Sequence, residues 1–310
     1  MKQPVENTPK NVGVASQGSQ TLVARKMRNR NIAVSERHWL GGDPYATAFF
    51  NALSAVFPRG EAFMIESLHP WASRGPPKLA ADVKTFIEQE AAHSREHAGL
   101  NRALIRAGYD IAPLDRAIRQ FVEFFGRTSE LTKLGATMCI EHLTAIVAAE
   151  MLDNPEHLKG CEDDVRKLWL WHGIEEVEHK AVAFDVWMWA TRDWSAARRW
   201  ATRAAMMCAV SISFFLNRTR GQIELLRQDG IGWKQGLPRL LRYGFAKGGI
   251  GRRIMRPWAQ FLKPGFHPWQ IDDHALIAKG EAMIAALEQG SKATTTDVAA
   301  PVQAITRKAA

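Results

Sequence analysis

Apolar residues recur at spacings of three and four along most of the chain, which is the period of amphipathic helices. Prolines, glycines and capping residues divide this pattern into separate segments. No segment shows the alternation of a strand that is followed by a hairpin turn. The predicted helices cover 44–72, with an interruption at Pro58, and then 78–107, 113–125, 129–152, 162–190 and 195–228. The sequence therefore predicts an all-α fold.

Composition divides the chain into four parts. Both ends are rich in small and polar residues, which predicts disordered tails over 1–33 and 290–310. Residues 34–192 are expected to form a helical bundle, and 193–289 a basic, aromatic-rich helical extension packed on it. The first tail lacks the apolar region of a secretory signal. The cysteines have no CxxC spacing, which favours a reducing cytoplasm and argues against a thiolate metal site: Cys139, Cys161 and Cys208.

The net charge of +9 is concentrated in the C-terminal third. Between Arg192 and Lys263 there are fifteen Lys or Arg and three acidic residues. Arginines are interleaved with large apolar residues in 233–245 and 252–258, a pattern that suits contact with an anionic membrane surface through residues 192–263. A solvated basic face explains the same pattern equally well. Nucleic acid is disfavoured as a partner because no recognised binding module accompanies these residues.

The apolar stretch 204–216 is too short to span a bilayer, which takes about 20 residues. A buried bundle helix is therefore the preferred interpretation over a transmembrane span.

Four of the predicted helices carry carboxylates and imidazoles at ordered spacings. An ExxH pair places a carboxylate and an imidazole one helical turn apart on one face. Two such pairs, each joined by a single Glu from another helix, are the ligand set of ferritin-like di-iron and di-manganese bundles. One match alone carries little weight, since Glu and His are common on solvated helix faces. The sequence predicts a two-metal site in a ferritin-like four-helix core, with these ligands: Glu61, Glu90, His93, Glu141, His172, Glu176 and His179.

Residues next to these ligands are expected to support them. His97 and Glu175 are close in angle to the ligand faces of their helices. His97 could be an extra ligand or a supporting partner, and Glu175 could replace Glu176. His142 points about 100° away from Glu141, so it is expected to support the site or the core rather than to bind metal. Glu178 is expected to face solvent or to pair with Lys180.

The predicted donor set also indicates the metal. Four carboxylates neutralise two ferrous ions, and neutral imidazoles add no charge, so the cluster can be buried. Oxygen-rich ligation without thiolate favours iron, with manganese second and zinc third.

Four motifs carry a resemblance to a known family. They are FPRGEAFM (57–64), FIEQEAAHSREH (86–97), IEHLTA (140–145) and WHGIEEVEHKAVAFDVW (171–187). They resemble the bacterial family described as predicted metal-dependent hydrolases, over about residues 35–275. The motifs of HD phosphohydrolases and of HExxH zinc proteases are absent. The order Glu, ExxH, Glu, HxxxExxH is similar to that of the di-iron arylamine N-oxygenases, and the likeness does not extend beyond the ligands to their substrate.

Three functions are compatible with this site. The preferred one is an oxygen-activating oxidase or oxygenase that acts on a hydrophobic or lipid-like substrate and takes electrons from a separate donor. The second is a metal-dependent hydrolase that uses a water activated by two metals, and the four carboxylates would blunt the Lewis acidity that it needs. The third is a metal-binding bundle without catalytic activity. The third imidazole, His172, favours the oxygen chemistry because it makes the site asymmetric.

Overall fold

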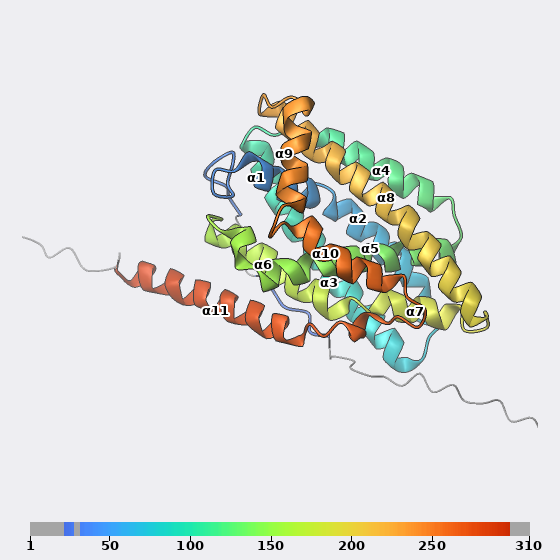
Figure 1. Ribbon diagram of the computed structural model, residues 1–310. Helices are drawn as coiled ribbons and strands as arrows, with labels where there is room; N and C mark the ends of the chain where they lie inside the picture. Colours follow the sequence, from blue (N-terminus) through green and yellow to red (C-terminus); the bar gives the residue numbers. More distant parts are fainter. Residues whose placement is uncertain (1–21, 28–31, 298–310) are drawn as a thin grey trace, which may run out of the picture.

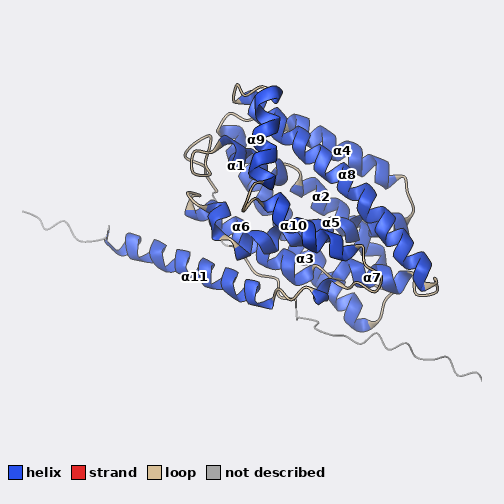
Figure 2. Cartoon of the chain, in the orientation of Figure 1, coloured by secondary structure: helices blue, strands red, loops and turns tan. Residues whose placement is uncertain are grey.

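The computed structural model describes residues 22–27 and 32–297. Within these ranges every regular element is helical, as Figure 2 shows, so the all-α prediction is confirmed. Four helices carry the predicted metal ligands, and their bounds are α2 (Phe57–Leu68), α3 (Pro77–Arg106), α5 (Glu130–Asp153) and α6 (Asp163–His179).

The remaining helices surround these four. They are α1 (Pro44–Ser54), α4 (Ala112–Gly126), α7 (Val182–Ala190), α8 (Ala196–Gln228), α9 (Trp233–Phe245), α10 (Ile250–Phe261) and α11 (His274–Asp297). Short 3-10 turns follow α2 and α5 and precede α11: His69–Trp71, Pro155–Leu158 and Pro268–Gln270.

The four ligand-bearing helices form a closed core. α2 packs on α3, α3 on α6, α6 on α5, and α5 on α2. Helices α8 and α10 cover α5, and α11 lies along α6 at the edge of the molecule (Figure 1). The approach of α11 requires Gly280, because a Cβ there would stand 2.7 Å from the Ile174 side chain. The correspondence of this core to ferritin-like bundles stays a prediction.

Local signals explain where several helices begin. The Asp43 side chain accepts hydrogen bonds from the first amides of α1, and the Ser129 hydroxyl accepts one from the Thr132 amide of α5. Both side chains satisfy backbone donors that have no partner within the helix. Pro58 occupies the first turn of α2, where it needs no backbone N–H. The expected interruption at this proline is therefore present, and it places Glu61 in the second turn of a new helix.

The predicted continuous helix over 162–190 is wrong in one respect. It divides into α6 and α7 at Lys180 and Ala181. Lys180 is buried, and its Nζ donates to Asp273 Oδ2 at 2.6 Å and to the Ile271 carbonyl oxygen at 2.7 Å. The break thus coincides with an interaction that depends on a segment about 90 residues further along, which local sequence does not reveal.

The two predicted tails also need correction where the structure describes them. Helix α11 continues to Asp297, beyond the expected end of order at 290. Residues 22–27 lie against α3 and α6, where the Gln89 amide donates to the Val23 carbonyl and the Trp171 indole donates to the Arg25 carbonyl. The rest of the predicted tails, 1–21, 28–31 and 298–310, lies outside the described residues.

Arg25 also corrects the expectation for Glu178. The Glu178 side chain is buried, and its two oxygens each lie 2.7 Å from a nitrogen of the Arg25 guanidinium. The same guanidinium reaches Glu281 on α11 at 2.7 Å. Glu178 therefore neither faces solvent nor pairs with Lys180, because residues 22–27 and α11 cover its side of α6.

The apolar surface is divided between core and exterior. Among the described helices, only α5 is long and apolar enough to cross a membrane, and 78% of that apolar stretch is buried. The 204–216 stretch lies on α8, where Met207 and Val210 are buried but Ile212 and Leu216 are exposed. Large apolar side chains are also exposed on α9 and α10, namely Trp233, Leu241, Phe245 and Met255. Contact with an anionic membrane stays a prediction.

The Arg25 ion pairs lead to a stability prediction. Replacing Arg25 by Ala should lower the free energy of unfolding by about 2–3 kcal/mol, because Glu178 is left buried without its partner. Replacing the half-exposed Glu281 by Ala should cost less than about 1 kcal/mol. Urea denaturation measures both. The double variant Arg25→Ala, Glu178→Gln should recover part of the loss, and equal losses for Arg25→Ala and Glu281→Ala would contradict this account.

Candidate metal centre

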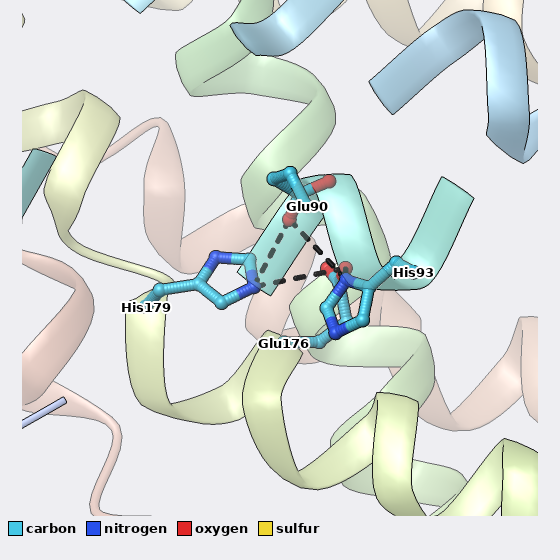
Figure 3. Close-up of side chains that lie close together, drawn as sticks. All are labelled: Glu90, His93, Glu176 and His179. Carbon is cyan, nitrogen blue, oxygen red and sulfur yellow. Dashed lines mark ion pairs between the residues drawn. The ribbon is translucent and has the colours of Figure 1, made fainter. Parts of the chain in front are cut away.

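The two ExxH pairs meet at the centre of the core. Glu90 and His93 come from α3, Glu176 and His179 come from α6, and Figure 3 shows the four side chains turned toward one another. One donor atom from each lies within 4.8 Å of the others, and all four residues are buried. Glu90 Oε1 is 3.2 Å from His179 Nε2 and 3.5 Å from His93 Nδ1. Two carboxylates and two imidazoles at these separations can enclose a metal ion.

A second group adjoins the first. Glu61, His93 and His172 also place one donor atom each within 4.8 Å of one another. His172 Nε2 lies 3.9 Å from Glu61 Oε1 and 2.8 Å from Glu176 Oε1. Because His93 belongs to both groups and Glu176 contacts His172, the arrangement can place a second ion beside the first.

Glu141 belongs to neither group. Its Oε2 lies 2.9 Å from His179 Nδ1, on the side of the ring that faces away from Glu90. Glu175 occupies the equivalent place at the other imidazole, with Oε2 3.0 Å from His93 Nε2. A carboxylate in this position fixes the tautomer and orientation of a metal-binding histidine. The structure thus gives Glu141 a supporting contact, and its role as a direct ligand stays a prediction.

The hydrogen bonding of the cluster fits a bound cation. Several buried carboxylate oxygens and imidazole nitrogens have no hydrogen-bond partner. They are Glu61 Oε1, Glu90 Oε1 and Oε2, His93 Nδ1, Glu141 Oε1, Glu176 Oε2 and His179 Nε2. Buried polar atoms are almost always paired, and leaving them unpaired is costly. A metal at this position would satisfy carboxylate oxygens and imidazole nitrogens together.

The pKa values of the carboxylates report the same demand for positive charge. Burial, together with repulsion from neighbouring carboxylates, raises the pKa of Glu61 well above its ordinary value. Burial likewise raises the pKa of Glu90 and of Glu141 to about 8. Burial acts in the same direction on Glu176, but the hydrogen bond and charge of His172 outweigh it and lower that pKa to about 2. Without a metal, the cluster therefore retains protons in the place where cations would bind.

The pKa values of the imidazoles are also shifted in opposite directions. Burial opposes protonation of His179, but the charge and hydrogen bond of Glu141 prevail and raise its pKa to about 10. Burial and the nearby His93 lower the pKa of His172. The His93 and His172 rings are stacked with centroids 4.1 Å apart, so the two imidazoles enter the site side by side.

Of the two histidines expected to support the site, His97 contacts a predicted ligand and His142 does not. His97 Nε2 lies 2.6 Å from His172 Nδ1, and its Nδ1 lies 2.9 Å from the Ser54 hydroxyl. Burial lowers the His97 pKa well below its ordinary value. His142 is remote from this network, because its Nε2 lies 3.2 Å from the Pro257 carbonyl oxygen and its ring packs on Phe261. His97 therefore orients His172, whereas His142 joins α5 to α10.

Two contacts had no signal in the sequence. The Ser94 hydroxyl donates to Glu61 Oε2 at 2.9 Å, and the Arg25 amide donates to Glu175 Oε1 at 2.6 Å. The first links neighbouring helices, and the second links residues 150 positions apart. Neither follows from spacing within one helix, which is the only relation that periodicity measures.

Comparison with known proteins agrees with this chemistry. The model of a family described as predicted metal-dependent hydrolase matches residues 24–272, and the chain belongs to that family. No curated protein and no solved structure matches the chain. The family and the buried cluster of His and Glu together support metal dependence.

The two ligand groups predict that substitutions in the site will leave different numbers of metal ions per chain. Glu176→Ala should remove both ions because Glu176 contacts all three cluster imidazoles, whereas Glu61→Ala should reduce two ions per chain to one. Metal analysis by mass spectrometry of folded protein measures the ratio. The matched control is Glu66→Ala, an exposed glutamate on the same helix as Glu61, which should leave two. One ion per wild-type chain, or an unchanged Glu61→Ala, would rule out the second group.

Removing the metal should make stability depend on pH. Between pH 6.5 and about 8, the folded metal-free chain holds protons on Glu90, Glu141 and His179 that the unfolded chain releases. The free energy of unfolding should therefore fall as pH rises through this window, by up to about 1.4 kcal/mol per pH unit for each proton.

The histidines with lowered pKa, such as His172, oppose this trend only at the lower end of the window, where their unfolded forms still hold part of a proton. Glu176 is ionised in both states throughout the window. Bound metal replaces the protons, so the slope should be smaller in metal-loaded protein. Urea denaturation at both ends of the window, with and without metal, measures the slopes, and a steeper slope with metal would refute the linkage.

Proposed function

We propose that this protein is a di-metal enzyme, with iron as the first choice of metal, that activates dioxygen to oxidise a hydrophobic substrate. The observation that carries the proposal is the apolar cavity next to the cluster. Glu61 and Glu176 are part of its wall, which is otherwise formed largely by apolar side chains, among them Val56, Phe57, Met64, Ile118, Phe121, Ile140, Val210 and Phe214.

A second cavity adjoins the first and also reaches the site. Its wall includes His172 and Glu176, together with apolar residues such as Phe50, Leu53, Met151 and Trp169. The two cavities share Phe57, Thr144, Glu176 and Phe214. A molecule that approaches the cluster from this side would meet mostly apolar surface, which favours a hydrophobic substrate and excludes water.

The opposite side of the cluster is closed by protein. His93 and His179 turn their outer nitrogens to Glu175 and Glu141, and both carboxylates are buried. Glu61, His172 and Glu176 line the cavities, and Glu176 lines both of them. These three residues are therefore the ones that a substrate would contact first, while the supported imidazoles hold the far side in place.

The donor set suits redox chemistry. Two ferrous ions held there would supply electrons for the reduction of dioxygen, and a separate electron donor would restore them. The carboxylates of Glu61, Glu90, Glu141 and Glu176 balance the positive charge of such a pair, while His93, His172 and His179 add none. Exclusion of water by the apolar walls would protect an oxidising site from side reactions.

The second candidate is a metal-dependent hydrolase, which the description of the family favours. The same ions would then activate a water for attack on an ester or phosphoester. The cavity wall is predominantly apolar, which suits the hydrophobic body of a substrate better than a phosphoester. A bundle that only binds metal would have no need of a cavity at the cluster, so it ranks third.

Spectroscopy and turnover distinguish these functions. Protein loaded with Fe(II) under argon should change its visible absorption when oxygen is admitted, and His172→Ala should weaken that change. Glu66→Ala, which lies outside the site, should behave as wild type. Hydrolysis of a nitrophenyl ester by the metal-loaded protein under argon, with no change on exposure to oxygen, would reject the oxidase in favour of the hydrolase.

A further inference from the structure

One buried cation lies in the wall of the cavity that reaches the cluster. Arg218 on α8 is 7% exposed and lines the same cavity as Glu61 and Glu176. Ser213 and Asn217, which lie five residues and one residue before Arg218 on α8, line it too. With Thr144, they are the polar side chains of this wall outside the metal site.

The hydrogen bonding of Arg218 leaves most of its donors unused. Its one hydrogen bond in the described structure goes from Nη1 to the carbonyl oxygen of Ala52, near the C-terminal end of α1. A guanidinium has five N–H donors. No carboxylate of the described residues forms an ion pair with it. Burial lowers its pKa to about 10, so the group remains charged at neutral pH.

A second buried arginine on α8 shows what a purely structural role requires. Arg203 donates to two backbone carbonyl oxygens, those of Phe261 and Lys263. Its guanidinium also lies against the rings of Phe184, Phe261 and Phe266. Arg203 lines neither of the two cavities beside the cluster. Arg218, by contrast, donates to one carbonyl oxygen, and its guanidinium carbon lies 6.0 Å from the ring centroid of Phe214.

An isolated buried cation is costly unless an anion accompanies it. We propose that Arg218 binds the carboxylate of the substrate, whose hydrophobic body lies in the apolar cavity against the metal cluster. The substrate class is therefore an amphipathic carboxylic acid. A guanidinium fits a carboxylate through two parallel hydrogen bonds. One positive charge balances a single negative charge, whereas a phosphate monoester would bring nearly two.

The neighbouring polar groups complete the site. Asn217 Nδ2 donates to the Ser213 hydroxyl oxygen at 3.3 Å, which leaves the hydroxyl proton available to a ligand. This substrate assignment rests on the proposed function for what happens to the hydrophobic body. Binding of the acid itself does not depend on the reaction at the metal.

Calorimetry with matched acids and esters tests the proposal. The probes are decanoate and 4-phenylbutyrate, their methyl esters, and decyl phosphate, added under argon to metal-loaded and to metal-free full-length protein. At least one acid should bind about ten- to a hundredfold more tightly than its ester in both forms of the protein. A preference for the acid that disappears without metal would place the carboxylate on the metal and overturn the role of Arg218.

Variants on α8 separate recognition from folding. Arg218→Met should reduce the preference for the acid to about onefold while affinity for the ester persists. Arg220→Met, an exposed arginine on the same helix, should keep the preference. If Arg218→Met does not fold, Arg218→Lys provides the test, and it should weaken acid binding severalfold with ester binding unchanged.

Three further results would overturn the proposal. They are equal affinity of wild type for acid and ester, equal losses for acid and ester in the Arg218 variant, and tighter binding of decyl phosphate than of decanoate. The proposed oxidation is judged separately. An acid preference in a protein that shows no reaction with oxygen would support the role of Arg218 and reject the oxidase.

Discussion

Negative charge inside a helical protein has to be matched by positive charge, and this requirement governs the centre of the molecule. Glu61, Glu90, Glu141 and Glu176 are buried together on four helices, and several of their oxygens have no hydrogen-bond donor. Protons can meet the demand in part, as the raised pKa values of Glu90 and Glu141 indicate. Cations meet it fully. The four helices that supply these carboxylates are therefore held by a shared electrostatic need as well as by their apolar contacts.

The cluster has a supporting layer that differs on its two sides. On the closed side, carboxylates hold the outer nitrogens of His93 and His179, and residues 22–27 in turn contact Glu175. On the open side, the wall is apolar and carries the single cation of Arg218. The closed side fixes the ligands, and the open side leaves room for a substrate. This division gives the site a direction, since the cavities meet the cluster at Glu61, His172 and Glu176.

The sequence predicted most helices between 44 and 228 and the residues of the two ExxH pairs, because both depend on spacing within one helix. The ExxH pairs at Glu90 and Glu176 meet as predicted from their order. Two of the failures, the break at Lys180 and the burial of Glu178, concern α6, where every residue from Leu168 to His179 is buried. Periodicity assumes one buried face, but α3, α5, α11 and residues 22–27 surround α6 and leave no solvent face for Glu178. Contacts between distant segments, such as Arg25 with Glu178 and Lys180 with Asp273, do not produce a periodic pattern in the sequence.

The Arg25 contacts have a consequence for the order of assembly. Arg25 leaves the ribosome early, but Glu178 follows about 150 residues later and Glu281 about 250 residues later. Residues 22–27 must therefore wait, without these partners, until Glu178 and Glu281 have been synthesised. The support that it gives to Glu175, and through Glu175 to His93, is completed only then. The contacts of Arg25 with Glu175, Glu178 and Glu281 therefore form late in synthesis, and a translation product that ends before Glu175 lacks all three.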